Sequence, residues 1–392
     1  MIGFGSFRAD EKKVHCSTMT NITNKERIGW IDALRGFTMI LVVFSHVEAW
    51  GLGITGDQIS ANAVFRMFRM PLFFFVSGFI AYKFDEDWNA CYYKKCLLKK
   101  LRVQLIPMLF FGLLYAMLVY SPQNNTPLRD SVVLFFNSSA KLGYWFTEVL
   151  LEMFLVYYTV SFLMRRRRLV SRQIILGIIA VCFFVLSMLG SSFYAEHAIS
   201  NWLCLSNLFL YFQFFVFGAI VSCYREKVFR IVENPYIIGV LLLSFFGLYI
   251  AGYTLHNSAR SVLMIGVSKI TNNLVRYLGV ITLFTLFRHY QKFFSSDTRV
   301  GRGLQYVGRR TLDIYLLHYF LIPTLPSVGS FLSQAGVVIE VTAALGLSIL
   351  VILFCLIISS IIRISPFLAY WLFGVKWERN FDATTPLSEY NK

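Results

Sequence analysis

The sequence predicts an all-α, polytopic membrane protein, a bundle of about ten transmembrane helices with both termini in the cytoplasm. Composition gives the first observation: the 392 residues are 57% hydrophobic and only 15% charged, whereas soluble domains carry about 25% charged residues. Charge gives the second, because a formal +16 on so apolar a chain is typical neither of nucleic-acid binders nor of disordered tails. The third is a series of long apolar stretches.

A helix needs about 20 mostly apolar residues to cross a bilayer. The connections between such stretches are short, and no internal repeat is evident. We therefore predict one ten-span membrane domain over 30–365, a cytoplasmic N-terminal segment over 1–29 and a cytoplasmic tail over 366–392. The ten stretches lie at about 30–50, 65–82, 103–120, 144–164, 173–190, 207–223, 236–254, 274–290, 311–327 and 340–362.

Orientation follows from the basic residues, which are retained on the cytoplasmic side of a membrane. With the N-terminus inside, 29 of the 37 Lys and Arg residues fall in inside segments and four in outside loops. This predicts a multi-pass protein of the inner (plasma) membrane with N-in and C-in topology. The first stretch lacks a small-residue cleavage site, so it is expected to be a retained helix. Translation begins at either Met1 or Met19.

The remaining charged residues lie within the stretches, where charge is costly and usually functional. In the first stretch, Arg35 and His46 are eleven positions apart, about three helical turns, so they share a face roughly 16–17 Å apart along the axis. Asp32 falls near the same stripe. His46 is either a proton acceptor or a histidine bonded to a neighbouring carbonyl. Glu48 is expected at the membrane interface.

Two further stretches add candidates. Arg66 and Arg69 are one turn apart at the start of the second and share a face; they either line a site or extend to the lipid headgroups. In the fourth stretch Trp145 could stack on a sugar ring. Glu148 there could bind sugar hydroxyls or orient an imidazole, and the alternative is a polar stripe lining a wet cavity.

The ninth stretch carries Asp313, Tyr315 and His318. His318 is either a second acid or base or a packing histidine with a hydrogen-bond partner. The cysteines lack the spacing of a metal site, and HExxH, GxSxG and phosphate-loop motifs are absent, so we predict no metal and no permanently bound cofactor.

Four segments together resemble the acyltransferase-3 family of integral membrane O-acyltransferases. They are WIDALRGFTMILVVFSH with its Arg-x10-His spacing, the Arg-x-x-Arg pair before MPLFFFVSGF, GYWFTEVLL and LDIYLLHYF. The resemblance implies transfer of an acyl group, usually acetyl from acetyl-CoA, to a sugar hydroxyl of a surface glycan. The family's motif residues correspond to Arg35, His46, Arg66 and Arg69. Some members append an extracellular esterase-like domain, which this chain lacks.

The predicted function is therefore that of an O-acyltransferase, which uses acyl-CoA as co-substrate and a glycan or lipid-linked saccharide as acceptor. The lipid bilayer is its surroundings, and no nucleic-acid partner is expected. His46 would either deprotonate the acceptor hydroxyl or carry the acetyl group itself. Arg35 would meet the CoA phosphates, and Arg66 and Arg69 would stabilise the oxyanion or hold an anionic acceptor. The alternative is a secondary transporter or flippase of a sugar or small anion, which also uses intramembrane charges.

Overall fold

The computed structural model describes residues 28–54, 61–82, 88–188, 197–258 and 261–375. Every regular element in these ranges is helical. Nine helices there are long and apolar enough to cross a bilayer, or ten if one bent pair counts as a span. The predicted all-α membrane bundle is confirmed. The predicted N-terminal segment and most of the predicted tail lie outside the described residues, and the sidedness of both termini stays a prediction.

The elements follow one another with short connections. The long helices are α2 (Gly29–His46), α3 (Ala61–Ala81), α8 (Trp145–Leu163), α9 (Leu169–Met188), α12 (Leu205–Cys223), α14 (Tyr236–Ser258), α15 (Val262–His289) and α19 (Val337–Ile362). The shorter elements are η1 (Val47–Gly51), α4 (Ala90–Lys100), η2 (Leu101–Leu105), α5 (Ile106–Tyr115), η3 (Ala116–Tyr120), α6 (Ser121–Asn124), α7 (Leu128–Asn137), η4 (Lys141–Gly143), α11 (Ala198–Trp202), α13 (Arg225–Val232), α16 (Arg299–Arg309), α17 (Thr311–Leu321), α18 (Pro326–Ala335) and α20 (Pro366–Leu372).

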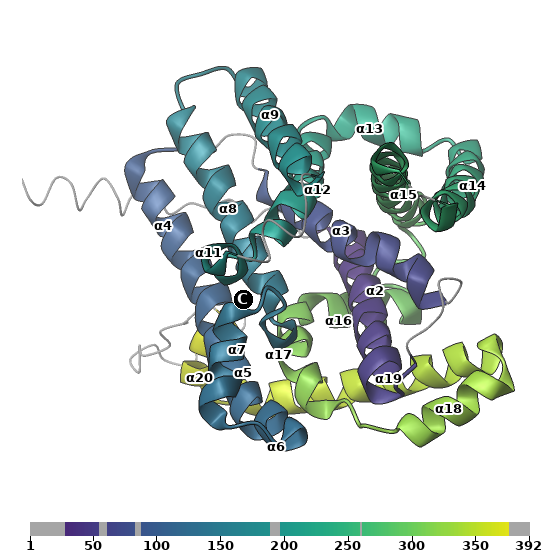
Figure 1. Ribbon diagram of the computed structural model, residues 1–392. Helices are drawn as coiled ribbons and strands as arrows, with labels where there is room; N and C mark the ends of the chain where they lie inside the picture. The colour runs from purple at the N-terminus through teal and green to yellow at the C-terminus, as the bar shows by residue number, and fades with distance from the viewer. Residues whose placement is uncertain (1–27, 55–60, 83–87, 189–196, 259–260, 376–392) are drawn as a thin grey trace, which may run out of the picture.

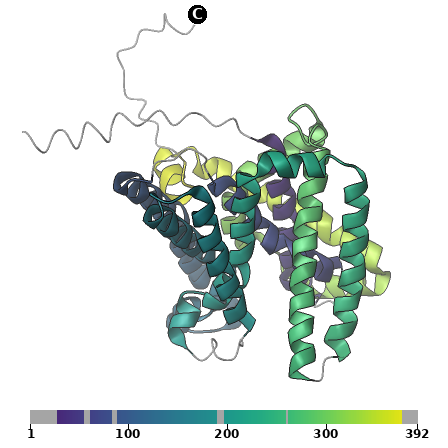
Figure 2. The same cartoon turned by 90° about the horizontal axis from the view of Figure 1, so that it is seen from above.

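Helix α2 lies at the centre of the bundle (Figure 1) and packs on α3, α15, α16, α17 and α19. Its first half is buried in an apolar cluster with α3, α8 and α12. Its second half is buried in another cluster, with α5, α17 and α19. The α14–α15 pair stands on one side of this centre and the α4–α8 group on the other (Figure 2). The residues of the first motif are therefore surrounded by the rest of the protein.

The third predicted span, 103–120, is the middle part of a longer helix. The helical stretch runs continuously over Ala90–Asn124 and includes two π-helical turns, η2 and η3. The lysines before the apolar residues lie outside the predicted span. They continue the helix instead, because lysine is a good helix former and its charged end can extend to water.

The ninth predicted span, 311–327, is wrong in its shape. Helix α17 ends at Leu321, and α18 leaves it at an angle of 104°. An 11-residue helix is only about 16 Å long, too short for a hydrocarbon core of about 30 Å. Pro323 cannot donate a backbone hydrogen bond and disfavours a helical conformation in the residue before it, which favours a helix end here. Pro326 begins α18, a position where proline is well tolerated. His318 consequently lies one turn before a helix end.

Helices α2 and α16 cross at very close range. A Cβ atom on Gly308 of α16 would lie 1.8 Å from the carbonyl oxygen of Asp32, and a Cβ on Gly36 of α2 would lie 2.0 Å from that of Leu304. Small residues permit such backbone contact between helices. Gly303, on the same helix α16, has no atom within 4 Å of its Cβ position.

Gly308→Ala is expected to lower the thermal stability of the protein in detergent, since the added methyl group forces α16 away from α2. Overpacking of this kind costs about 1–3 kcal/mol. Gly303→Ala is the matched control and should leave the melting temperature unchanged or raise it slightly, because alanine favours a helix. Equal melting temperatures for the two variants would contradict the close crossing.

Candidate functional site

Two interrupted helices meet at one end of α2. After His46 the chain continues as the π-helical turn η1, and α17 ends at Leu321 before the bend into α18. The backbone N–H of Leu325, in the bend, donates to the carbonyl oxygen of Gly51 at 2.6 Å. Irregular backbone at membrane depth is tolerated only where protein covers it or it lines a cavity. π-Helical turns also concentrate at functional sites.

The meeting of these helices brings His46 and His318 together. Nδ1 of His46 and Nε2 of His318 share a hydrogen bond of 2.9 Å, and the two rings are nearly parallel at a centroid distance of 5.1 Å. The Nδ1–H of His318 donates to the carbonyl oxygen of Ile314 at 3.0 Å. His318 is completely buried, whereas His46 is half-buried. Of the two imidazoles, His46 is thus the one that a substrate can reach.

Aromatic rings surround the histidine pair. Trp50 stacks on His46 at 4.9 Å, and Tyr319 packs on His318 at 3.9 Å and on His46 at 5.2 Å. Trp50 is 44% exposed and is a site residue that the sequence reasoning missed. Its spacing was a usable signal, since a residue four positions after His46 lies on the same helical face. The rings restrict the orientation of both imidazoles.

The third motif holds α17 in place. The carbonyl oxygen of Gly143 accepts hydrogen bonds from the hydroxyls of Tyr315 (2.8 Å) and Tyr319 (2.9 Å). The hydroxyl of Tyr144 donates to the carbonyl of Leu316 at 2.9 Å. Gly143 has a φ of +102°, and a Cβ there would lie 2.5 Å from the Tyr319 ring. Glycine is therefore required both by the backbone and by the contact.

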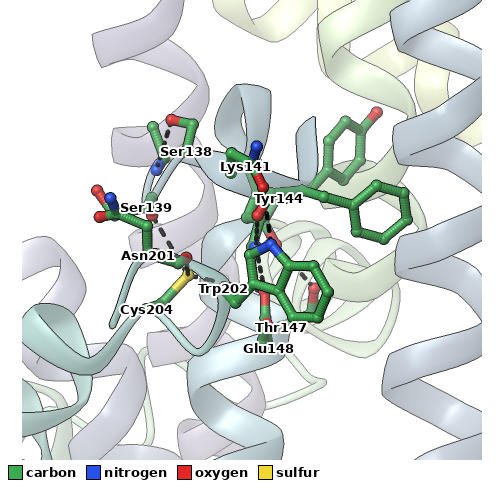
Figure 3. A network of polar contacts seen from close by, with 12 residues as sticks. Ser138, Ser139, Lys141, Tyr144, Thr147, Glu148, Asn201, Trp202 and Cys204 are labelled. Atoms are coloured by element: carbon green, nitrogen blue, oxygen red, sulfur yellow. Dashed lines mark hydrogen bonds and ion pairs between the residues drawn. The ribbon is translucent and has the colours of Figure 1, made fainter. Parts of the chain in front are cut away.

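Glu148 faces a different group of residues from the histidines (Figure 3). Its carboxylate lies 3.7 Å from Nζ of the buried Lys141 and 3.7 Å from Sγ of Cys204. Lys141 also donates to the carbonyl of Phe136 at 2.6 Å, and Cys204 donates to that of Ser139 at 3.3 Å. The network joins α7, α8 and α12. We expected Glu148 to bind sugar hydroxyls or to orient an imidazole. In the structure its carboxylate lies next to Lys141 and Cys204 and not next to a histidine.

Trp145 is packed among other rings. Its neighbours are Phe74, Phe146 and Tyr211, at centroid distances of 5.8–6.4 Å. Its ring is thus engaged in the first apolar cluster and does not stand open as a sugar platform. Because the next two residues of α8, Phe146 and Thr147, line the cavity described below, Trp145 supports that wall.

The two arginines of the second motif have different surroundings. Arg69 donates to Asn62 Oδ1 at 2.9 Å and is among the charged groups facing His46. Arg66 is exposed and is among the groups facing Tyr249 on α14. Glu48, expected at the interface, is instead 99% buried because α19 covers η1, and it faces Arg69 and Glu340. Of the two arginines, Arg69 is therefore the one whose charge acts on His46.

A cavity of about 270 Å³ follows the face of α2 that begins at Arg35. Arg35 forms one polar end with Thr311, to whose Oγ1 it donates at 2.8 Å, and with Asp32, at 3.6 Å. Lys100 also lines the cavity, with its Nζ over the ring of Phe154. The predicted shared stripe of Asp32 and Arg35 is confirmed. The other walls are mostly apolar and include Met39, Val42, Met70, Phe73, Phe146, Leu150 and Tyr315.

The cavity points toward the histidine pair along two helices. Val42, which lines it, lies one turn before His46 on α2, and Tyr315 lies one turn before His318 on α17. The cavity that Arg35 and Lys100 line therefore reaches residues one helical turn from the two imidazoles, although neither histidine lines it. Narrow, mostly apolar cavities with a few polar groups are typical ligand sites.

Asp313 has a structural role. It is almost fully buried and accepts two hydrogen bonds from Arg363, at 2.8 and 2.9 Å, and one from Ser359. Bidentate pairing of this kind is the strongest form of the Arg–carboxylate interaction. It fixes α17 to α19 at the end of α17 opposite His318, so Asp313 is not available to a substrate.

Comparison with known protein families gives one result. The model of the acyltransferase-3 family, described as an acyltransferase domain, matches residues 28–360. This range contains all the candidate residues discussed above. No curated protein and no solved structure shows a significant match.

Asp313→Ala is expected to destabilise the protein by about 3 kcal/mol or more, because it leaves a partly buried guanidinium without its carboxylate. Arg363→Met should be similarly costly. The double variant should lose less than the two single losses together, since neither charge is then left alone. Thermal unfolding in detergent measures all three, and strictly additive losses would contradict the pairing.

Proposed function

Because this chain belongs to the acyltransferase-3 family and is thus a membrane acyltransferase, we propose that it transfers an acetyl group, or another short acyl group, from acyl-CoA to a sugar hydroxyl. The acceptor is a cell-surface or lipid-linked saccharide. Acyl-CoA is consumed as a co-substrate and no cofactor stays bound. The single observation that carries the proposal is the His46–His318 pair beyond the apolar end of a cavity whose other end is cationic.

The cavity suits the donor. Arg35 and Lys100 offer positive charge for the phosphates of CoA. A volume of about 270 Å³ lies below the 300–1,000 Å³ of ordinary ligand pockets. It therefore fits a slender pantetheine arm with its acyl group, while the nucleotide stays outside. The thioester is then delivered toward His46, roughly 16–17 Å along α2 from Arg35.

His46 supplies the base. In direct transfer its imidazole takes the proton of the acceptor hydroxyl as the oxygen attacks the thioester carbon. The C–S bond breaks, and the proton passes to the thiolate to give free CoA. In the second route the imidazole attacks the thioester carbon, the C–S bond breaks and CoA leaves as the thiolate. The acceptor hydroxyl then attacks the acetyl-imidazole, the imidazole is released, and the hydroxyl proton passes to the thiolate. Arg69, beside His46, stabilises the oxyanion or holds an anionic acceptor.

In this proposal the enzyme lies in the inner (plasma) membrane with both termini in the cytoplasm. The asymmetry of Lys and Arg supports that orientation. Acyl-CoA is a cytoplasmic metabolite and enters at Arg35, while the saccharide meets His46 in the outer half. The bent α17–α18 pair is also a feature of secondary transporters. Proton-coupled uptake that is independent of acyl-CoA would favour that alternative.

His46→Ala is expected to lower acetyl-CoA-dependent acetylation of membrane saccharide by about 10²–10⁴-fold, the usual contribution of general acid–base catalysis. The purified enzyme is reconstituted into membranes together with host glycan, and the assay measures transfer of radiolabelled acetyl from acetyl-CoA to the glycan. His256→Ala, an exposed histidine on α14, is the control and should keep wild-type activity. An active His46→Ala protein at normal expression would overturn the assignment.

Lys100→Gln is expected to raise KM for acetyl-CoA about tenfold, because it removes one charge-assisted contact to a phosphate. KM for acetyl-pantetheine, which lacks the nucleotide phosphates, should stay unchanged. Lys95→Gln, an exposed lysine on the same helix α4, is the control. An equal rise in KM for both donors would show that Lys100 does not meet the nucleotide.

A further inference from the structure

The hydrogen bonds of the histidine pair have a fixed direction. A backbone carbonyl can only accept, so the 3.0 Å contact between His318 Nδ1 and the oxygen of Ile314 requires a proton on Nδ1. A neutral imidazole carries one proton, so Nε2 of His318 is then an acceptor. The 2.9 Å bond from that nitrogen to His46 Nδ1 requires a proton on the latter. The remaining nitrogen of His46, Nε2, is left with its lone pair.

The surroundings favour the neutral form of His318. Its side chain is fully buried, and the ring lies against those of Tyr319, Tyr315 and His46. A charged imidazolium without a carboxylate partner is costly in such a place. Arg69, on α3, faces His46 and adds a positive charge to the same region. A second resting cation is therefore disfavoured.

The ring of His318 is also held against rotation. A 180° flip about the Cβ–Cγ bond would put Cδ2 where Nδ1 lies and Cε1 where Nε2 lies, and both hydrogen bonds would be lost. Tyr319 packs on the ring at 3.9 Å and is itself tied to the Gly143 carbonyl by its hydroxyl. The glycine of the third motif thus acts through Tyr319 on the histidine of the fourth.

We propose that His318 is a positioning residue that holds His46 in the tautomer with a free Nε2, and that Nε2 is the atom which reacts. This proposal rests on the proposed function and goes beyond it by naming the nitrogen and its partner. Both nitrogens of His318 are engaged and its side chain is buried, so it does not touch the substrate. When His46 gains a proton at Nε2, its Nδ1–H still donates to His318, which shares the new charge.

The direct test is nitrogen NMR of the wild-type protein in lipid bilayers, with ¹⁵N-labelled histidine. The signals of His46 are identified by their loss in His46→Gln. We expect its Nε2 to be unprotonated and its Nδ1 protonated, with a through-bond or through-space contact to Nε2 of His318. An unprotonated Nδ1 in His46 would overturn the proposal, whatever the activity.

The functional test compares two variants of the positioning residue. His318→Gln retains a side-chain acceptor and should keep activity within about tenfold of wild type. His318→Phe retains an aromatic ring without an acceptor, so His46 can adopt the wrong tautomer, and activity should fall about 10²-fold or more; loss of the correct tautomer in a serine-protease triad costs about 10⁴. KM for acetyl-CoA should change in neither variant.

Equal activity of the two folded variants would overturn the proposal. If His318→Phe fails to fold, the NMR result on the wild-type protein decides it. A failure of the proposed function looks different: His46→Ala would remain active while His46 still showed the expected tautomer.

Discussion

The site depends on one constraint, the need to satisfy backbone polar groups inside a bilayer. Two helices, α2 and α17, lose their regular form at the same depth, at η1 and in the bend before α18. Each can do so because the other covers it, and the hydrogen bond from Leu325 to Gly51 joins them. His46 is the last residue of α2, and His318 lies one turn before the end of α17. The contact between the two imidazoles therefore lies directly beside the point where the two breaks meet.

Residues around this point hold α17 in position. Asp313 and Arg363 anchor one end of α17 to α19, and Gly143 anchors the other through Tyr315 and Tyr319. An ion pair with one partner removed is costly, and so is a buried hydroxyl or carbonyl that loses its hydrogen-bond partner, so both anchors resist displacement of α17. The helix is short, and fixing its two ends determines where His318 lies.

Much of the fold could be predicted from the sequence, because apolar stretches and helical spacing are local signals. The all-α bundle and the shared stripe of Asp32 and Arg35 follow from spacing alone. Contacts between distant segments could not be predicted in this way: His46 and His318 are 272 positions apart. The burial of Glu48 also depends on a partner helix, since α19 covers it. The break in α17 had a local signal in Pro323, but the apolar residues around it concealed its effect.

Arg35 and His46, near the two ends of the central helix α2, are separated by mostly apolar residues. A cation at Arg35 suits phosphates that should remain in water, while a neutral imidazole with a free lone pair suits a reaction in a drier place. The cavity between them is walled by apolar side chains such as Met39 and Val42. In the proposed reaction, water in this cavity would compete with the acceptor hydroxyl for the acyl group, so a narrow apolar passage would favour transfer over hydrolysis.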